Sequence, residues 1–423
     1  MSDLINRKRL FLACSLALVV TALTFSIRAN LLGTLGTHFQ LNPREVGEIA
    51  SAAFWGFTIA MFIGGPLCDV LGLGRMYLLA FIAHLAGIVL TIFSKEYWPL
   101  FLSTLLVGVG NGFIESASYT MVSSMYSDDK ARKINDWHIW FPGGIVIGGL
   151  ITWLLTKWEV NWQWQMAVMI APTLVYGYLF LGQKFPHSER IKLKISTREM
   201  LRACLSPLFI FMLLCMLLTA ATELGTNQWI AELLANVGVP SILLLVFING
   251  IMAIGRANAG LLLKKVSPTG LLLFSAIFSF VGLIWLSYAS GYVSFVAAGI
   301  FAVGICFFWP TMIGFVADKL YKTGPLGLSL MGGFGLLSTA LVLPFMGEIY
   351  AAQSAKAATA LTAQNIPVDQ LAAQATIEAG AATLRLVSIM PAVLIVAFTI
   401  LHFYMRRRGQ RQSHLPETLN TSI

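Results

Sequence analysis

Apolar residues are grouped along the chain in twelve blocks, most of which are long enough to cross the core of a lipid bilayer. A transmembrane helix needs roughly 20 such residues, and short polar or charged segments separate the blocks. The blocks do not alternate between apolar and polar positions, as the strands of a transmembrane barrel would. Because the bilayer core offers the backbone no water, each block is predicted to form a helix. The predicted spans are 10–38, 45–68, 75–94, 98–125, 138–156, 163–182, 206–234, 240–262, 268–288, 293–316, 328–350 and 385–405.

The composition indicates an integral membrane protein. Hydrophobic residues make up 57% of the 423-residue chain and charged residues only 11%, whereas soluble domains carry about 25% charged residues. The first block, from Phe11 to Ile27, is too long for the core of a signal peptide, and no small-residue cleavage site follows it. We therefore predict that this block is a retained first helix.

The lysines and arginines give the predicted spans an orientation. With the N-terminus placed inside, 21 of the 28 basic residues fall in inner segments, five in outer segments and two within spans. Basic residues concentrate on the cytoplasmic side of membrane proteins, so both termini are predicted to be cytoplasmic and the protein to be multi-pass in the cell (inner) membrane. The basic residues are spread over seven inner segments, which explains the net charge of +9 without a nucleic-acid partner.

The chain divides into two related halves. The turn after span two, from Gly65 to Arg75, and the turn after span eight, from Gly260 to Pro268, each place a glycine at a helix end and a charge four residues later. Two halves alike in orientation and six spans apart are typical of two-bundle secondary transporters. The predicted fold is therefore all-α, with twelve transmembrane helices in two pseudo-symmetric six-helix bundles. The predicted units are a bundle at 1–182, a cytoplasmic linker at 183–205, a second bundle at 206–405 and a basic cytoplasmic tail at 406–423.

Two long connecting segments also have helical features. Within the linker, Ser196 is a good N-cap residue and good helix formers follow it, which predicts a short helix lying along the membrane surface. The longest outer segment, about 351–384, is rich in Ala, Gln and Thr. Because Ala and Gln favour helix, we expect this segment to be partly helical.

Arg28 and Glu115 are the clearest ionisable residues within the predicted spans. A charge at the bilayer centre costs roughly 2.5–3.5 kcal/mol, so such a residue usually lines a cavity and has a partner. We hypothesise that Glu115 carries the coupling ion, pairing with Arg28 in one state and releasing it on protonation or solute binding. The alternative is a fixed ion pair that holds two helices together. His138, near Asp136 at the inner end of span five, is either a third coupling residue or a hydrogen-bonded packing group.

Polar and aromatic residues of spans seven and ten are candidates for binding a solute. Glu223 and Asn227 are four residues apart and share a helix face. Pro310 interrupts span ten because proline removes a helix hydrogen bond, and broken helices often border binding sites. The alternative role for these polar residues is contact between helices. The substrate-binding candidates are Arg28, Asn30, Asn111, Trp140, Glu223, Asn227, Gln228 and Trp309, and Asn249 could join them.

The turn around Asp69 resembles the signature of the major facilitator superfamily between its second and third helices. Gly65, Asp69 and Gly72 match that signature, and the arginine comes late, at Arg75. The resemblance implies that Asp69 and Arg75, together with Lys264 in the corresponding turn of the second half, gate the inner ends of the two bundles.

Three segments are similar to the fucose-permease-like sugar:cation symporters. They are the glycine-rich run 110–117 with Glu115, the start of span five at 134–144, and the run 223–229 of span seven. The resemblance implies transport of a sugar or polyol coupled to protons or sodium. The aspartate that fucose permease has in helix one is replaced here by Ala29, so a relay of two carboxylates is not carried over.

These observations predict a secondary active transporter of a small polar solute, working by alternating access as a monomer. The sequence shows no phosphate loop, nucleophile triad or metal-ligand spacing, so we expect no enzyme activity, cofactor or metal. Arg256 in span eight is predicted to bind either the carbonyl groups at the end of another span or an anionic substrate. Two alternative functions remain. One is an organic anion carrier in which Arg28 and Arg256 clamp the anion, and the other is a lipid flippase or membrane receptor.

Overall fold

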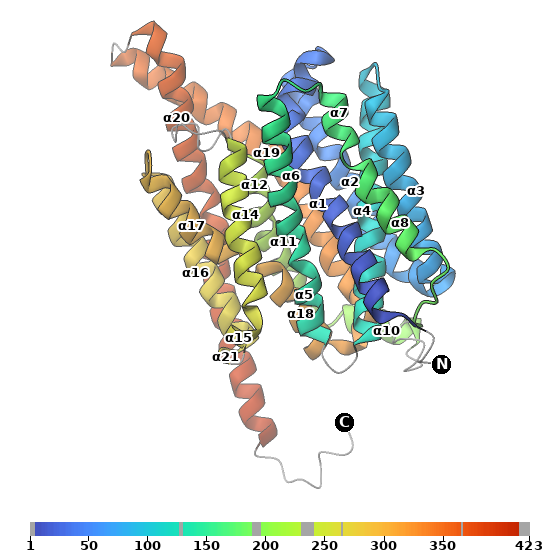
Figure 1. Cartoon of the computed structure of the whole chain (residues 1–423). Helices are drawn as coiled ribbons and strands as arrows, with labels where there is room; N and C mark the ends of the chain where they lie inside the picture. Colours follow the sequence, from blue (N-terminus) through green and yellow to red (C-terminus); the bar gives the residue numbers. More distant parts are fainter. Residues whose placement is uncertain are drawn as a thin grey trace.

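The computed structural model of this chain describes residues 5–126, 130–187, 196–229, 241–263, 265–364 and 367–413. Most of these residues are helical, and none of them lies in a β-strand. The helices run side by side in one elongated bundle, and the chain enters α1 and leaves α21 at the same end of that bundle, which we call the termini end (Figure 1).

The first half of the chain supplies the helices that correspond to predicted spans one to six. They are α1 (Arg7–His38), α2 (Pro43–Leu71), α3 (Leu73–Ile92), α4 (Tyr97–Met125), α5 (Lys130–His138), α6 (Trp140–Lys157), α7 (Trp162–Ala167) and α8 (Ile170–Phe180). The second half supplies the helices of spans seven to twelve. They are α11 (Pro207–Ala220), the π-helical segment η2 (Ala221–Gly225), α12 (Thr226–Gln228), α14 (Ser241–Ala257), α15 (Ala259–Leu263), α16 (Pro268–Leu286), α17 (Val293–Ile305), α18 (Phe308–Lys319), the 3₁₀ turn η4 (Tyr321–Thr323), α19 (Gly324–Ala363), α20 (Val368–Val387) and α21 (Ile389–Ser413).

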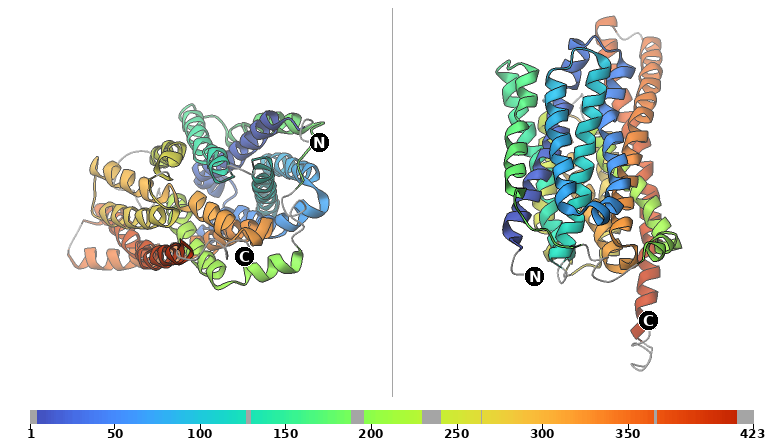
Figure 2. Two further views of the ribbon diagram at one scale, coloured as in Figure 1. Left: turned by 90° about the horizontal axis from the view of Figure 1, so that it is seen from below. Right: turned by 90° about the vertical axis from the view of Figure 1, so that its right-hand side faces the viewer.

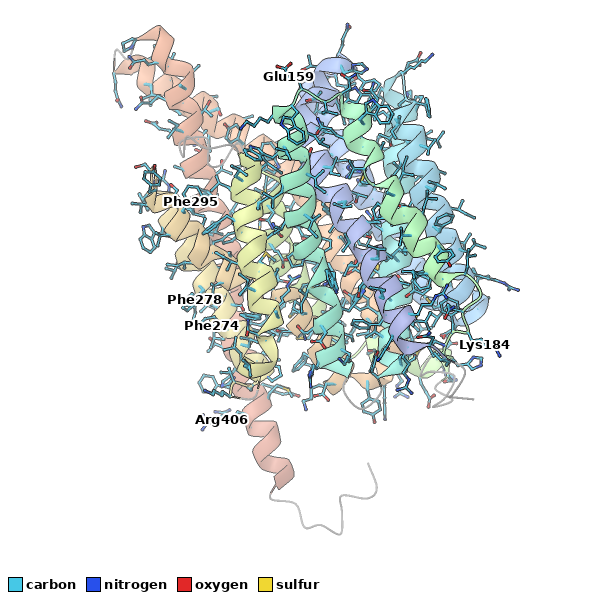
Figure 3. The ribbon with its side chains drawn as sticks, viewed as in Figure 1. Glu159, Lys184, Phe274, Phe278, Phe295 and Arg406 are labelled. Atoms are coloured by element: carbon cyan, nitrogen blue, oxygen red, sulfur yellow. The ribbon has the colours of Figure 1, made fainter. Side chains whose placement is uncertain are left out.

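Ten helices in the described part of the chain are long and apolar enough to cross a membrane. Predicted spans six and eight consist of shorter helices, α7 with α8 and α14 with α15. Large apolar side chains cover the outside of the bundle, including Phe274 of α16, whereas Lys184 and Arg406 lie towards the termini end and Glu159 at the opposite end (Figure 3). An apolar band between two polar ends fits a bilayer, and the chain is a multi-pass membrane protein.

The two halves of the bundle meet along a few helix pairs. α2 lies against α19, α6 against α14, and α5 against α18. Seen along the bundle axis, the helices of the first half lie on one side and most of those of the second half on the other (Figure 2). Gly65 of α2 lies so close to Ser329 and Pro325 of α19 that an added Cβ atom would crowd both residues. Small residues therefore allow the two halves to approach closely near the termini end.

Prolines explain the breaks within four pairs of consecutive helices, namely α5–α6, α7–α8, α17–α18 and α20–α21. Pro142, Pro172, Pro310 and Pro391 are each the third residue of the second helix of such a pair. A proline has no N–H group for the carbonyl four residues earlier, and its ring clashes with that carbonyl. The first helix of each pair therefore ends at the residue four positions before the proline, or next to it. The carbonyl of that residue needs another hydrogen-bond partner. The carbonyl of Cys306, freed by Pro310, becomes part of the site described below.

The described part of the linker contains the predicted short helix, α10 (Thr197–Cys204). Ser196 and Glu199 form a capping box at its start, in which each side chain bonds the backbone N–H of the other residue. The N–H of Ser196 is the main reason why the pKa of Glu199 is lowered. Met200 of α10 packs against Gly324, so the helix is held on the first residue of α19.

Helices at the two ends of the bundle extend beyond the predicted spans. α19 continues to Ala363 and α20 starts at Val368, so the segment 351–384 is helical over most of its length and forms a projection opposite the termini end (Figure 1). The expectation of partial helix is confirmed. α21 runs on to Ser413, so the boundary predicted at 405–406 does not coincide with a helix end, because Arg and Gln continue a helix well.

Close helix contacts at glycine predict a specific loss of stability. A Cβ atom added to Gly108 of α4 would overlap the carbonyl of Ala53 in α2. We expect Gly108→Ala to lower stability by about 1–3 kcal/mol, as overpacking does, and to lower the midpoint of thermal unfolding in detergent. The five cysteines are free and buried, so a thiol-reactive dye reports the transition. Gly47→Ala is the matched control, because a Cβ atom there meets nothing within 4 Å, and an equal loss in both variants would contradict the packing account.

Candidate functional site

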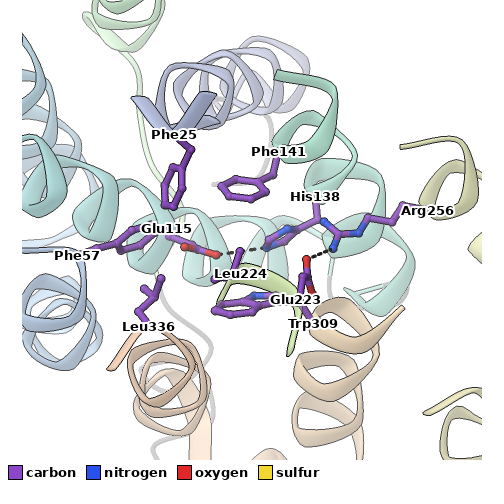
Figure 4. Close-up of a pocket in the computed structure, with 10 residues that line it drawn as sticks. All are labelled: Phe25, Phe57, Glu115, His138, Phe141, Glu223, Leu224, Arg256, Trp309 and Leu336. Carbon is purple, nitrogen blue, oxygen red and sulfur yellow. Dashed lines mark hydrogen bonds and ion pairs between the residues drawn. The ribbon is translucent and has the colours of Figure 1, made fainter. Parts of the chain in front are cut away.

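A pocket lies between the two halves, in the interior of the bundle. The empty space between its lining side chains amounts to about 330 Å³, part of which is open to the surroundings. Both halves contribute to its walls, which combine four ionisable side chains with aromatic and leucine side chains (Figure 4). The lining residues are Phe25, Phe57, Glu115, His138, Phe141, Glu223, Leu224, Arg256, Trp309 and Leu336.

Glu115 of α4 is held by residues of its own half. Tyr119, one turn along α4, donates its hydroxyl to Oε1 of Glu115 at 2.7 Å. Nε2 of His138 lies 3.4 Å from the same oxygen and 2.5 Å from the Tyr119 hydroxyl. Because the Tyr119 hydroxyl already donates to Glu115, its contact with His138 requires the imidazole to carry a proton on Nε2. The three buried side chains form one hydrogen-bonded cluster.

Trp309 connects this cluster to the second half of the chain. Its indole Nε1 donates to the Tyr119 hydroxyl at 3.0 Å. Trp309 belongs to α18 and Tyr119 to α4, so the hydrogen bond crosses the interface between the halves. The hydroxyl of Tyr119 thus accepts a hydrogen bond from Trp309 of the second half and donates one to Glu115 of its own half.

Glu223 and Arg256 form a buried ion pair within the second half. Nη2 of Arg256 lies 3.1 Å from Oε1 of Glu223, and both side chains are at most 3% exposed. Nε of Arg256 donates to the carbonyl of Cys306 at 2.9 Å, which is the carbonyl that Pro310 leaves without a helix partner. Arg256 therefore binds a carbonyl at the end of α17, one of the two partners expected for this residue, and a carboxylate in addition.

The π-helical segment η2 gives Glu223 its position. Residues 221–225 form a wider turn between α11 and α12, and such bulges are frequent at functional sites. Two pocket atoms remain without a hydrogen-bond partner, Oε2 of Glu223 and Nδ1 of His138. Since buried polar atoms are nearly always paired, these two atoms are candidates for contact with a bound solute.

The remaining walls of the pocket are apolar. The ring of Phe25 lies edge-on to Phe54, Phe57 and Phe141, with centroids 5.2–6.3 Å apart. Leu224 and Leu336 complete the apolar walls. A ligand with an apolar face would fit against these side chains, while its polar groups meet the ionisable residues.

Four of the predicted site residues meet in this pocket, namely Glu115, His138, Glu223 and Trp309. Arg256, for which a carbonyl or an anion was the expected partner, is also there. Asn227, one turn beyond Glu223, is buried and its Oδ1 has no partner.

Several other predicted residues are engaged elsewhere. Asn111 bonds His84 of α3 and Thr24 of α1, and Asn30 donates to Thr152 and Thr156 of α6. Both asparagines therefore connect helices within the first half, which was the alternative role of such residues.

Trp140, Asn249 and Gln228 do not line the pocket either. Trp140 is 43% exposed, and Asn249 donates to the carbonyl of Leu245 in its own helix. Gln228 is half-buried near the end of span seven.

The hypothesised pair between Arg28 and Glu115 is not formed. Glu115 is bound by Tyr119 and His138, and Nη1 of Arg28 is buried without a hydrogen-bond partner. One conformation does not test a pair that forms in only one state, so the hypothesis stays a prediction. Tyr119 and His138 already occupy the Glu115 carboxylate, and Arg28 lies one turn further from the termini end than Phe25, the α1 residue that lines the pocket.

The predicted gating residues lie near the termini end. Asp69 is in the last turn of α2 and is half-buried, and Arg75 is exposed in the first turn of α3. Lys264 lies outside the described residues. The gating roles stay predictions.

Sequence reasoning missed Tyr119 and the aromatic walls. Tyr119 lies four residues after Glu115, a spacing that places both on one helix face, so this signal was available. Phe25, Phe57 and Phe141 gave no signal, because a phenylalanine facing a pocket and one facing lipid look alike in a sequence. His84, which bonds Asn111 and Tyr176, was also missed.

The arrangement is suited to binding and to holding protons. Each carboxylate lies beside a nitrogen base or cation, and the described residues contain no group of three or more His, Cys, Asp or Glu that could hold a metal ion. Protonation of Glu115 or His138 would change a hydrogen-bond cluster that reaches across both halves.

The buried pair predicts strong coupling between its two members. Arg256→Gln leaves the Glu223 carboxylate buried and unpaired, so we expect it to destabilise the protein more than the double variant with Glu223→Gln does. The coupling energy from a double-mutant cycle should be about 1–3 kcal/mol, measured by thermal unfolding in detergent. The exposed pair Arg44–Glu48 is the matched control, with an expected coupling of about 0.3–0.5 kcal/mol. Equal coupling in the two pairs would contradict the buried ion pair.

Known proteins of similar sequence and fold are membrane transporters. The chain is 25% identical over 157 residues to a D-xylose transporter of Levilactobacillus brevis, covering 37% of this chain and 34% of that protein. It is 24% identical over 150 residues to myo-inositol transporter 1 of Candida albicans, covering 35% of this chain and 27% of that protein. The matched segments thus span about a third or less of these relatives.

Solved structures of such transporters share the whole fold. FucP in its outward conformation superimposes with a TM-score of 0.65 at 14% identity, covering 91% of this chain and 98% of that one. The xylose transporter XylE from E. coli, in a partially occluded inward-open conformation, gives a TM-score of 0.70 at 10% identity, with coverage of 92% and 96%. The sequence profile of the Major Facilitator Superfamily matches residues 14–343. Because this match covers most of the chain and the fold agrees with it, the chain belongs to the Major Facilitator Superfamily of membrane transporters.

Proposed function

We propose that this protein is a secondary active transporter that moves a small polar solute of the sugar or polyol class by alternating access, coupled to protons. The observation that carries the proposal is the placement of the Glu115–His138–Tyr119 cluster in a pocket between the two halves. The relatives named as xylose and inositol transporters support the solute class.

The pocket is composed as a sugar site would be. Trp309 and the phenylalanine rings offer apolar surface for the carbon skeleton of a sugar. The free atoms Oε2 of Glu223 and Nδ1 of His138 are available to hydroxyl groups. Hydrogen bonds from a solute to such buried atoms provide specificity, because any ligand that fails to make them leaves the atoms unpaired.

Protons are favoured over sodium as the coupling ion. A bound sodium ion would be held by several oxygen atoms. Here Oε1 of Glu115 lies against His138, and Oε1 of Glu223 lies against Arg256. A cation entering the pocket would meet these nitrogen groups, whereas a proton can bind Glu115 or His138 in place.

The alternatives fit the pocket less well. A clamp in which Arg28 and Arg256 hold one anion between them is not assembled, since Arg256 is bound to Glu223 and to the carbonyl of Cys306. A lipid flippase would need a lateral opening towards the lipid, whereas this pocket is lined by residues of both halves in the interior of the bundle. We further propose that the protein works as a monomer in the cell (inner) membrane with both termini cytoplasmic, as the distribution of basic residues indicates.

The test is transport by the purified protein in liposomes. Labelled solutes including xylose and inositol are screened by counterflow, and active solutes are then tested for accumulation driven by a pH gradient. We expect Glu115→Gln to retain counterflow and to lose accumulation above equilibrium, because the variant can exchange solute but cannot bind the coupled proton. Glu378→Gln, at an exposed carboxylate of α20, is the matched control.

Two results would contradict the proposal. Accumulation by Glu115→Gln equal to that of the unmodified protein would remove Glu115 as the proton carrier. Counterflow of no sugar or polyol in the panel would remove the solute class.

A further inference from the structure

Arg28 is a cation in the membrane interior for which the described residues provide no partner. Its Nη1 is buried and makes no hydrogen bond. The second arginine within the spans, Arg256, donates to Glu223 and to the carbonyl of Cys306. Placing a charge in the bilayer is costly, and such charges usually mark a functional site or have a partner. Arg28 as a whole is half-buried, and a partner from outside the chain would satisfy its buried Nη1.

The position of Arg28 places it next to the pocket. Phe25 lines the pocket and lies three residues earlier on α1, so the two side chains share a helix face. The face of α1 opposite Phe25 is used differently, since Leu23 and Ile27 pack in an apolar cluster within the first half. Arg28 thus follows the pocket by about one helical turn, or roughly 5 Å along the helix axis, in the direction away from the termini end.

Span seven has buried oxygen atoms without hydrogen-bond partners, and two of them also follow one another in the direction away from the termini end. Oε2 of Glu223 lies in the pocket, and Oδ1 of Asn227, one turn further along the span, is also buried without a partner. Span seven and α1 both leave the termini end, so Asn227 and Arg28 lie on the same side of the pocket. Acceptors of span seven thus lie in the pocket, at Glu223, and one turn beyond it, at Asn227, while the positive donor Arg28 lies one turn beyond it on α1.

We infer that the transported solute carries a carboxylate that binds Arg28, which makes it a polyhydroxylated acid such as a sugar acid. This inference rests on the proposed function and narrows its solute class. Hydroxyl groups donate to the free oxygens of Glu223 and Asn227, and the carboxylate accepts from the guanidinium in the two-pronged geometry that arginine favours.

The charges of the site favour a carboxylate over a phosphate ester. Arg256 pairs with Glu223, so when Glu115 carries the coupled proton one unmatched positive charge remains, that of Arg28. A carboxylate supplies one negative charge. A phosphate monoester carries about −1.5 to −2 at neutral pH, and its excess charge would be repelled by the carboxylate of Glu223.

Matched pairs of solutes test the inference. The pairs are D-glucuronate with D-glucose, D-galacturonate with D-galactose, and D-gluconate with sorbitol, and glucose 6-phosphate serves as the phosphate ester. Binding to purified protein is measured by thermal shift, and transport by counterflow in liposomes. We expect one or more acids to bind at least about tenfold more tightly than their neutral partners, the effect of a charge-assisted hydrogen bond. We expect Arg28→Gln to abolish this preference.

Two variants separate substrate binding from a structural role. Arg44→Gln, at an exposed arginine of α2, should keep the full preference for the acid. Arg28→Gln should unfold at a temperature no lower than that of the unmodified protein when no solute is present, because it removes a charge that has no partner in the chain. A lower unfolding temperature would assign Arg28 a structural role and overturn the inference.

The remaining outcomes are distinct. Equal binding of the acids and their neutral partners would overturn the inference while leaving the proposed sugar transport intact. A preference for acids that survives in Arg28→Gln, or tighter binding of glucose 6-phosphate than of D-glucuronate, would also overturn it. Failure of every sugar, polyol and acid to bind or exchange would remove the proposed function as well.

Discussion

The carbonyl of Cys306, left without a helix partner by Pro310, is the constraint on which the second half of the site depends. In a bilayer a free carbonyl cannot turn to water, so a donor within the protein must satisfy it. Arg256 supplies that donor at 2.9 Å. A guanidinium brought into the interior in turn requires a negative charge, and Glu223 provides it from the π-helical segment of span seven. One missing N–H group thus accounts for the place of an arginine and a glutamate on two other helices.

The same break in span ten also connects the two halves of the molecule. Trp309 directly precedes Pro310 in the first turn of α18, and its indole reaches the Tyr119 hydroxyl of α4. Tyr119 in turn orients Glu115 and His138. The contacts that arrange both carboxylates of the pocket therefore start from one short segment, residues 306–310. The apolar rings around them exclude water, which strengthens each of these polar contacts.

The sequence was informative about features that depend on one helix alone. Apolar blocks predicted the spans, Pro310 predicted the break in span ten, and charges within apolar blocks marked Glu115, Glu223 and Arg256. Partners across helices could not be predicted in the same way, because they depend on how each helix is rotated about its axis. Arg28 and Glu115 were the obvious pair by charge, yet Tyr119 and His138 bind Glu115. The rotation that turns Asn111 towards His84 and Thr24 likewise removes it from the pocket.

Under the proposed function, the hydrogen bond between Trp309 and Tyr119 relates the movement of the halves to the state of the proton site. α18 and α4 belong to different halves, so rocking them apart must lengthen or break this bond. The Tyr119 hydroxyl then loses the hydrogen bond from Trp309 and keeps only those with Glu115 and His138. Protonation of Glu115 acts on the same hydroxyl from the other side, since a neutral carboxyl accepts less strongly than a carboxylate. A change at the interface and a change of charge therefore act on a single oxygen atom, which is the kind of local link that coupled transport requires.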